Sequence, residues 1–165
     1  MAQTSFGVTR RPITPQDKPF LYRVYASTRE AELAQLDWDE DRKAAFLEMQ
    51  FHAQHHYYQE QFAQADFDLI LLDGEPIGRL YVDRREDEIR IIDIALLTAY
   101  RNHGIGSALL GEILADGERA GLPVRVHVER HNPALSLYNR LGFHKIGESD
   151  VYFLLEWSPE RSGRK

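Results

Sequence analysis

The alternation of apolar and polar positions along the chain predicts one domain built from both strands and helices. Stretches rich in β-branched and other apolar residues are expected to be strands at residues 6–13, 67–72, 77–82, 91–97, 124–128, 143–148 and 151–157. Stretches with apolar residues at helical spacing are expected to be helices at residues 14–36, 37–64, 107–120 and 132–141. This order of elements predicts an α/β (α+β) fold with a mixed sheet.

Capping residues mark the starts of the two early helices. Thr14 can cap the first helix, with Pro15 in its first position and Asp17 returning the contact, and Asp37-Trp38-Asp39-Glu40 begins the second. The residues expected on the buried sides are Leu21, Val24, Tyr25, Thr28 and Leu36 in the first helix and Phe46, Leu47, Met49, Gln50 and Phe51 in the second.

Turn signals separate the later elements. The Asp73-Gly74 pair predicts a tight hairpin turn that needs positive φ, and the charged segment 83–88 predicts a solvated second turn. Gly121 is expected to end the helix at 107–120.

Composition and charge narrow the function. With 165 residues, 43% of them hydrophobic, the chain suits a single domain at 1–157 with a disordered tail at 158–165. The absence of cysteine excludes disulfides, a thiol nucleophile and thiolate zinc sites. The net charge of −6 argues against a nucleic-acid surface and mildly favours cationic partners. No apolar run approaches membrane-spanning length and no signal peptide is evident, so we expect a cytoplasmic protein without membrane contact.

A glycine turn is the main candidate for binding chemistry. Arg101-Asn102-His103-Gly104-Ile105-Gly106-Ser107-Ala108 lies between an apolar strand and an amphipathic helix. The first N–H groups of a helix have no internal partner and carry the positive end of its dipole, so a phosphate group can bind there. A Walker loop and a dinucleotide fingerprint both fit poorly, because the first lacks its Gly-Lys-Ser/Thr and the second lacks a glycine at Leu109. A plain connecting turn is the simpler alternative.

Two segments resemble the signatures of the GNAT superfamily of N-acetyltransferases. Leu96 to Gly106 resembles the acetyl-CoA loop, and Asn132 to Phe143 resembles the second signature. The similarity is tight over residues 90–147, with two departures: Thr98 stands where proline is common, and the spacing from Asn132 to Tyr138 is short. The resemblance implies a mostly antiparallel sheet of six to seven strands flanked by about four helices.

The resemblance also implies which residues bind acetyl-CoA and act in catalysis. The cofactor-binding residues implied are Leu96, Leu97, Thr98, Arg101, Asn102, His103, Gly104, Ile105, Gly106, Ser107, Asn132 and Tyr138. Tyr138 is the expected general acid, because the matching tyrosine points at the cofactor sulfur. A backbone N–H at Leu96 or Leu97 would polarise the thioester carbonyl. Asn132 is equally well explained as a helix cap.

The general base is open among several groups. Asp93 lies inside an apolar strand, where an unpaired charge is costly, so it needs a partner or a task. His127 lies in the strand at 124–128, with Glu129 expected on its opposite face, and a water chain could replace either. We favour Asp93 and His127 jointly. No metal site is expected; the cluster of His52, His55 and His56 is interpreted as a polar helix face near the acceptor groove.

These observations predict an acetyl-CoA-dependent N-acetyltransferase that acts on a primary amine of a small molecule or peptide. Transfer would be direct, since the chain has no cysteine to carry an acyl group. The alternatives are a non-catalytic acyl-CoA-binding or sensing module of the same fold and a nucleotide-dependent oxidoreductase. Related folds often dimerise, so a homodimer is a further expectation. The acceptor is not identified by the sequence.

Overall fold

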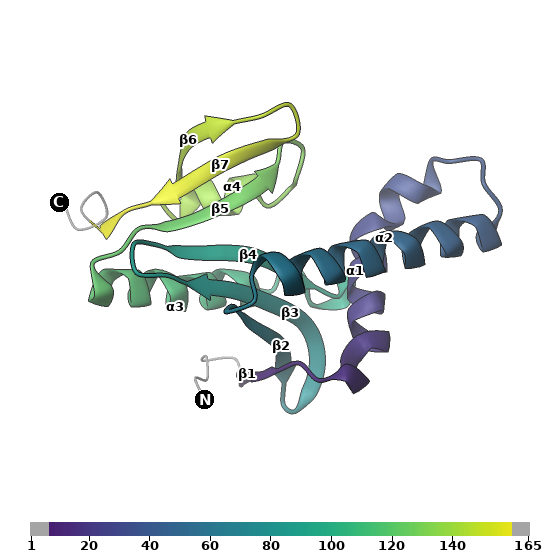
Figure 1. Cartoon of the computed structure of the whole chain (residues 1–165), viewed down its shortest axis with the longest axis horizontal. Coiled ribbons are helices and arrows are strands. Elements are labelled where there is room, and N and C mark those ends of the chain that lie inside the picture. Colours follow the sequence, from purple (N-terminus) through teal and green to yellow (C-terminus); the bar gives the residue numbers. More distant parts are fainter. Residues whose placement is uncertain (1–6, 160–165) are drawn as a thin grey trace.

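The computed structural model describes residues 7–159, which form a seven-stranded sheet in the order β1-β2-β3-β4-β5-β7-β6 (Figure 1). The strands are β1 (Val8–Pro12), β2 (Asp66–Leu72), β3 (Glu75–Arg84), β4 (Ile89–Leu96), β5 (Val124–Glu129), β6 (His144–Glu148) and β7 (Tyr152–Trp157). The helices are α1 (Lys18–Ala34), α2 (Glu40–Gln61), α3 (Ile105–Ala120) and α4 (Leu135–Arg140), with 3-10 turns η1 (Pro15–Asp17) and η2 (Thr98–Tyr100).

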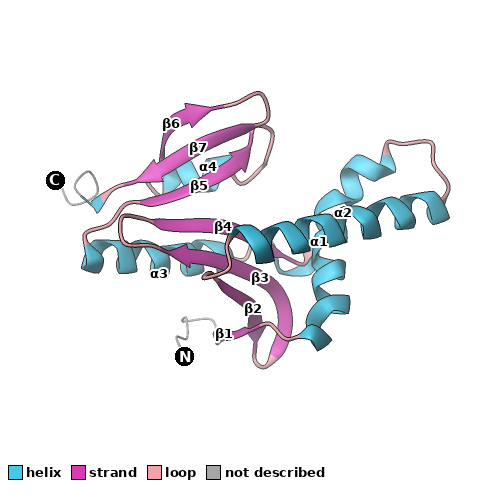
Figure 2. Cartoon of the chain, in the orientation of Figure 1, coloured by secondary structure: helices cyan, strands magenta, loops and turns pink. Residues whose placement is uncertain are grey.

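The sheet is mixed but mostly antiparallel, as predicted. Within the described strands, β4 and β5 are the one parallel pair, and the other neighbours are antiparallel. The parallel pair requires a crossover connection, which α3 supplies between these two strands (Figure 2). No helix in residues 7–159 combines the length and apolar character needed to cross a bilayer.

Separate hydrophobic cores cover the two faces of the sheet. The larger core joins one face to α3 and α4, and its buried members include Leu80, Ile91, Val126, Leu109, Ile113 and Tyr138. The smaller core joins the other face to α1 and α2 through Leu21, Tyr25, Phe51 and Leu69. A residue that alternates along a strand therefore meets either the α3–α4 layer or the α1–α2 layer.

The capping signals place the early helices close to their predicted starts. The Thr14 N–H donates to the Asp17 carboxylate at 2.7 Å, as expected of a capping box, although the first turn is the 3-10 helix η1 and α1 begins at Lys18. Asp39 caps α2 by accepting the Arg42 N–H at 2.7 Å. Helix α2 ends at Gln61, three residues earlier than predicted.

Asp17 is an anchor between β1 and α1. Arg11 donates to both of its carboxylate oxygens, at 2.8 and 2.9 Å, and only 8% of Asp17 is exposed. The hydrogen bonds from Arg11 and from the Thr14 N–H hold the pKa of Asp17 down at about 2.

Asp17→Asn is therefore expected to lower the free energy of unfolding by about 2 kcal/mol at pH 7. Because the folded-state pKa is depressed, this contribution is complete above the unfolded value of about 3.9 and is lost as the pH falls through about 2. Urea unfolding of both proteins at pH 7 and at pH 2 measures it. The exposed Asp37→Asn is the control, and a loss for Asp17→Asn no larger than the control's would contradict the prediction.

The predicted buried sides of α1 and α2 are correct for some residues and wrong for others. Leu21, Val24 and Phe51 are buried as expected. Met49 is 58% exposed and Leu36, just after α1, is 40% exposed, and Thr28 is also exposed. Met49 is two residues from the buried Phe51, about 200° around the helix, so it lies on the side of α2 that faces away from the sheet.

The turns give one confirmation and one correction. Asp73 and Gly74 have φ of 50° and 87°, as the hairpin turn requires. The charged segment 83–88 is not simply solvated, because Glu88 is only 4% exposed and accepts bonds from Arg85 at 3.0 Å and Arg125 at 2.7 Å. Burial alone would raise the pKa of Glu88, but its hydrogen bonds and ion pairs with arginine lower it.

The end of α3 can be compared with its prediction, whereas the two ends of the chain can be compared only in part. Gly121 ends α3 with a φ of 70°, as predicted. The first residue of the strand predicted at 6–13 and most of the tail predicted at 158–165 lie outside the described residues.

Candidate functional site

The sheet divides where β4 and β5 stop pairing. Their parallel register runs from Ile89 opposite Val124 to Ile91 opposite Val126. Strand β4 nevertheless continues to Leu96 and β5 to Glu129, and Figure 1 shows the β5-β7-β6 section turned away from the β1–β4 section. Beyond Ile91 the backbone groups on the facing edges of β4 and β5 therefore no longer pair with each other. We call this region the split.

The hydrogen bonds of β4 decide which backbone donor faces the split. The Leu97 N–H donates to the Ile77 carbonyl at 2.8 Å, so it is already used. Adjacent residues of a strand point their N–H groups to opposite sides. The N–H of the preceding residue, Leu96, therefore points away from β3 and faces the split. Of the two residues that the sequence offered for polarising the thioester, the geometry favours Leu96.

The glycine turn forms a cradle at the start of α3. Asn102 and Gly104 both have positive φ, 62° and 84°, which turns the chain from η2 into the helix. The first bond of α3 runs from the Ala108 N–H to the Gly104 carbonyl at 3.0 Å. The N–H groups of residues 105–107 thus precede any acceptor in the helix and point out of its end. Such a group of N–H donors fits a pyrophosphate.

Arg101 is held beside the glycine turn rather than pointing freely from it. Its Nε donates to the Leu96 carbonyl at 2.8 Å, and its NH2 group donates to the Ser27 hydroxyl of α1 at 3.0 Å. Both contacts tie the cradle to β4 and α1. His103 is exposed on the turn and remains the freer charge partner for a phosphate. No local pattern points to Ser27, because it lies 74 residues earlier in the chain.

The second signature surrounds Tyr138. Asn132 accepts the Ala134 N–H at 2.8 Å just before α4, as its capping interpretation predicts. Tyr138 is 3% exposed, and its ring meets Phe143 edge to face with centroids 5.2 Å apart. Burial and the Asp93 charge raise the pKa of Tyr138 above its usual value, so the hydroxyl keeps its proton at neutral pH.

Asp93 owes its position to a β-bulge. Tyr81 lies opposite Asp93 and Val82 lies opposite Ile91, so Ile92 is an extra residue in β4. The bulge turns the Asp93 side chain to the α1–α2 face, where it forms an ion pair with Arg79 of β3. Arg79 is 2% exposed and was not predicted. Its signal was available: like Asp93, it is a charge inside an apolar strand.

His127 lies on the same face of the sheet as Asp93, across the split. Its Nδ1 is 3.3 Å from an Arg90 nitrogen, and burial and Arg90 lower the pKa of His127, so the ring is neutral at pH 7. Arginine only donates, so Nδ1 accepts and the ring proton lies on Nε2. With its proton on Nε2 and Nδ1 taken up by Arg90, His127 is poorly placed to accept a proton, which leaves Asp93 as the better base.

Glu129 corrects an expectation about the faces of β5. It lies on the same face as His127, because residues two apart in a strand point the same way. Its carboxylate is 3.7 Å from Arg29 of α1, which makes it an exposed bridge to that helix.

The histidine face of α2 is split between solvent and the sheet. His52 and His56 are exposed, with His56 paired to Glu60 at 3.3 Å, whereas His55 is half-buried and stacks on Phe51. Within residues 7–159, no group of three His, Cys, Asp or Glu side chains is placed to hold a metal ion.

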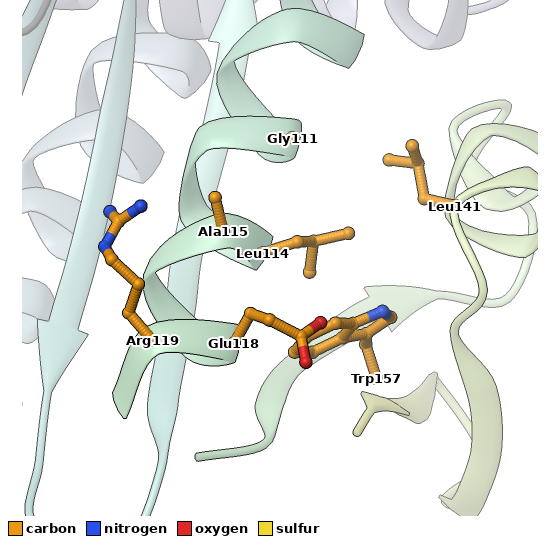
Figure 3. A pocket seen from close by; sticks show the side chains of 7 residues that line it. All are labelled: Gly111, Leu114, Ala115, Glu118, Arg119, Leu141 and Trp157. Atoms are coloured by element: carbon orange, nitrogen blue, oxygen red, sulfur yellow. The ribbon is translucent and has the colours of Figure 1, made fainter. Parts of the chain in front are cut away.

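A shallow cavity of about 450 Å³ lies away from the split (Figure 3). It is lined by residues of α3, by Leu141 after α4 and by Trp157 of β7. None of the predicted site residues lines it, so its volume does not bear on the chemistry of the split.

Comparison with known proteins supports the fold and the signatures. The family model described as "Acetyltransferase (GNAT) family" matches residues 25–143. No match was found among the curated proteins.

Solved structures of acetyltransferases share the fold at low sequence identity. The PaiA N-acetyltransferase of Thermoplasma acidophilum, in complex with coenzyme A, has a TM-score of 0.69 at 18% identity, covering 92% of this chain and 98% of that one. An acetyltransferase of Thermus thermophilus has a TM-score of 0.68 at 19% identity over 94% and 99% of the chains. The ribosomal-protein-S18-alanine N-acetyltransferase of Escherichia coli has a TM-score of 0.62 at 18% identity over 92% and 93%.

Proposed function

The chain belongs to the acetyltransferase (GNAT) family, and from that premise we propose that it transfers acetyl from acetyl-CoA directly to a primary amine of a small molecule or peptide. The observation that carries the proposal is the end of β4. There the Asp93 carboxylate, the unpaired edge at Leu96 and the cradle at the start of α3 follow one another within fifteen residues of the chain. A thioester, a pyrophosphate and an amine are the groups that these features suit.

The backbone would hold most of the acetyl-CoA. The N–H groups of residues 105–107 suit the pyrophosphate, with His103 near it, and Leu96 and Thr98 suit the pantetheine arm along β4. The Asn132 side-chain oxygen accepts the Ala134 N–H, and its second lone pair and the amide N–H groups are available to the arm. Arg101 contributes by fixing the end of β4, since its Nε holds the Leu96 carbonyl.

The reaction requires three groups from this chain: a donor to the carbonyl oxygen, a proton acceptor for the amine and a proton donor for the thiolate. The amine nitrogen attacks the thioester carbonyl carbon, forming the C–N bond, while the Leu96 N–H stabilises the carbonyl oxygen as it gains charge. Asp93 accepts the proton that the attacking nitrogen gives up and passes it to water. When the C–S bond breaks, Tyr138 donates its hydroxyl proton to the leaving thiolate and is reprotonated from solvent. The products are the N-acetyl amine and CoA.

A non-catalytic acyl-CoA-binding module of the same fold is the second candidate function. It shares the cradle and differs only in turnover, so the presence of Tyr138 and Asp93 at the split favours the enzyme. Neither function requires the exposed histidines of α2.

Two measurements on the wild-type protein test the proposal. Acetyl-CoA and CoA, each added at 100 times its Kd, are expected to stabilise the fold by about 2.7 kcal/mol in a thermal melt, whereas NADH and ATP are not. CoA release is then followed with a panel of alkyl amines, amino acids and short peptides with free N-termini. Stabilisation by acetyl-CoA without turnover of any amine would favour the binding module, and no stabilisation would contradict both functions.

A further inference from the structure

A cluster of buried polar side chains lies between α2 and the sheet, and of its members the reaction as described uses only Asp93. The side-chain atoms in residues 7–159 that are buried without a hydrogen-bond partner are His55 Nδ1, Arg79 Nε, Tyr81 Oη, Arg90 Nε and Asp93 Oδ2. His55, Arg79, Tyr81 and Asp93 belong to the layer where α2 covers β3 and β4. Two of these atoms nevertheless have ion-pair partners, Asp93 Oδ2 with Arg79 and Arg90 Nε with Glu88 at 3.1 Å. Native interiors rarely bury polar side chains without a reason, and the concentration of these groups beside the split points to a role there.

We propose that Arg79 is a positioning residue for acetyl transfer: it holds the Asp93 carboxylate toward the acceptor amine and links it, through Gln54, to helix α2. The inference rests on the proposed function, because it concerns the amine that Asp93 meets. It adds a residue that makes no contact with substrate itself.

The contacts of Arg79 define its reach. Its NH2 group donates to the side-chain oxygen Oε1 of Gln54 in α2 at 2.8 Å and forms the ion pair with Asp93 Oδ2. Its guanidinium carbon lies 5.2 Å from the centre of the Tyr81 ring. One group of atoms therefore joins α2, β3 and β4 at the depth of the split, and the guanidinium cannot swing away without losing all three contacts.

The ion pair leaves one carboxylate oxygen for the substrate. Oδ2 is fully buried against Arg79, whereas the Asp93 side chain as a whole is 23% exposed. The exposure lies elsewhere on the side chain, which leaves Oδ1 as the oxygen that can accept an amine N–H. Arg79 thus fixes the plane of the carboxylate and determines which oxygen faces the acceptor.

Stability alone is a poor reason for this pair. Replacing a buried ion pair with apolar residues of similar volume is often neutral or stabilising, because both charges must be removed from water. The surroundings of Asp93 are otherwise aromatic and uncharged at neutral pH: Tyr58 from α2, Tyr81 from β3 and Tyr138 from α4. Beyond them lie His55 on α2, Arg90 on β4, His127 on β5 and Tyr152 on β7. Arg79 is therefore the cation that sets the position of Asp93.

A double-mutant cycle in kcat tests the inference, with the best acceptor from the amine panel as the probe. Arg79→Met is expected to lower kcat about 10- to 30-fold, with the KM for acetyl-CoA within twofold of wild type. Asp93→Asn is expected to lower kcat by at least as much. In the double variant, Arg79→Met should add less than about twofold to the loss from Asp93→Asn, because Arg79 acts through Asp93.

The matched control is Arg125→Met. Arg125 also bridges carboxylates on this face, Glu88 at 2.7 Å and Glu156 at 2.9 Å, but it has no contact with Asp93. Its loss should reduce thermal stability with kcat within about twofold of wild type. If Arg79→Met does not fold, Arg79→Lys enters the same cycle; it keeps the charge and shortens the reach, and should retain more activity than Met. Gln54→Leu, which removes only the link to α2, should lower kcat by a smaller factor.

The outcomes separate the inference from the proposed function. Two results with an active wild type would overturn the positioning role alone. One is that the fold-losses in kcat from the Arg79 and Asp93 substitutions multiply in the double variant; the other is that the Arg79 variants keep full kcat. A wild type that binds acetyl-CoA and acetylates no amine would overturn the proposed function and this role with it.

Discussion

Replacing Gly106 with glutamate is expected to weaken acetyl-CoA binding at least about 100-fold, or about 2.7 kcal/mol, while the fold is retained. Gly106 lies in the first turn of α3, where the unpartnered N–H groups suit the pyrophosphate. A Cβ added there meets no atom within 4 Å, so the new side chain fits the protein. It would fill the space that the phosphates need and bring a negative charge against them.

The fold should tolerate this change, or gain from it. Glycine within a helix is destabilising by roughly 0.5–1 kcal/mol relative to alanine, and a carboxylate near a helix N-terminus is favourable. The thermal midpoint of Gly106→Glu without ligand is thus expected to equal or exceed that of the wild type. Loss of ligand binding then cannot be ascribed to unfolding.

Gly111 on the same helix supplies the control. A Cβ at Gly111 also meets nothing within 4 Å, and the residue is exposed, but it lies more than one turn beyond the helix start. Gly111→Glu is expected to bind acetyl-CoA within about threefold of wild type. Isothermal titration of the three proteins with acetyl-CoA at one ionic strength makes the comparison. Equal affinities for Gly106→Glu and Gly111→Glu would show that the phosphates bind elsewhere.

Tyr138→Phe is expected to lower kcat about 100- to 1000-fold with the Kd for acetyl-CoA little changed. The change removes one oxygen and keeps the ring that packs on Phe143, so the core is preserved. What is lost is the proton donor for the thiolate, which the variant must replace with water. Single-turnover and steady-state release of CoA separate this loss from any change in product release.

The pH dependence gives a second readout of Tyr138. A general acid must be protonated, and burial together with Asp93 raises the pKa of this hydroxyl above its usual value near 10. The wild-type kcat should therefore show no decline from ionisation of Tyr138 at or below pH 10. Tyr25→Phe, another buried tyrosine at 4% exposure, is the control and should keep kcat within about twofold. A kcat for Tyr138→Phe equal to that of the control would exclude Tyr138 as the acid.

The glycine cradle illustrates what could be predicted from the sequence. A phosphate site at a helix start depends on backbone groups and on local φ angles, and both are set by neighbouring residues in the chain. Gly104 at positive φ and the start of α3 at Ile105 give the predicted turn from strand to helix, and phosphate binding there stays a prediction. The same locality explains why the Asp73-Gly74 turn and the Gly121 helix end were predicted correctly.

The face of the sheet on which each site residue of β4 and β5 lies was harder to predict from the sequence. Simple alternation from Ile91 would have put Asp93 on the α3 side, and the bulge at Ile92 turns it to the α1–α2 side. A bulge reflects the pairing of two strands and leaves no reliable mark in one of them. Glu129, by contrast, was misplaced although alternation along β5 gives its face directly.

Long-range partners were beyond any pattern in the chain. Arg79 and Gln54 are separated by 25 residues and Arg101 and Ser27 by 74, and their bonds exist only because helices dock on the sheet.

The sequence by itself determined the order of the elements, the family signatures and the backbone cradle, because each depends on residues that are close along the chain. Only the tertiary structure decided that β4 and β5 part after Ile91, that Leu96 rather than Leu97 offers a free N–H, and that Asp93 pairs with a buried Arg79. Strand register, side-chain direction and burial depend on which distant segments meet, and that is fixed by the packing of the whole domain.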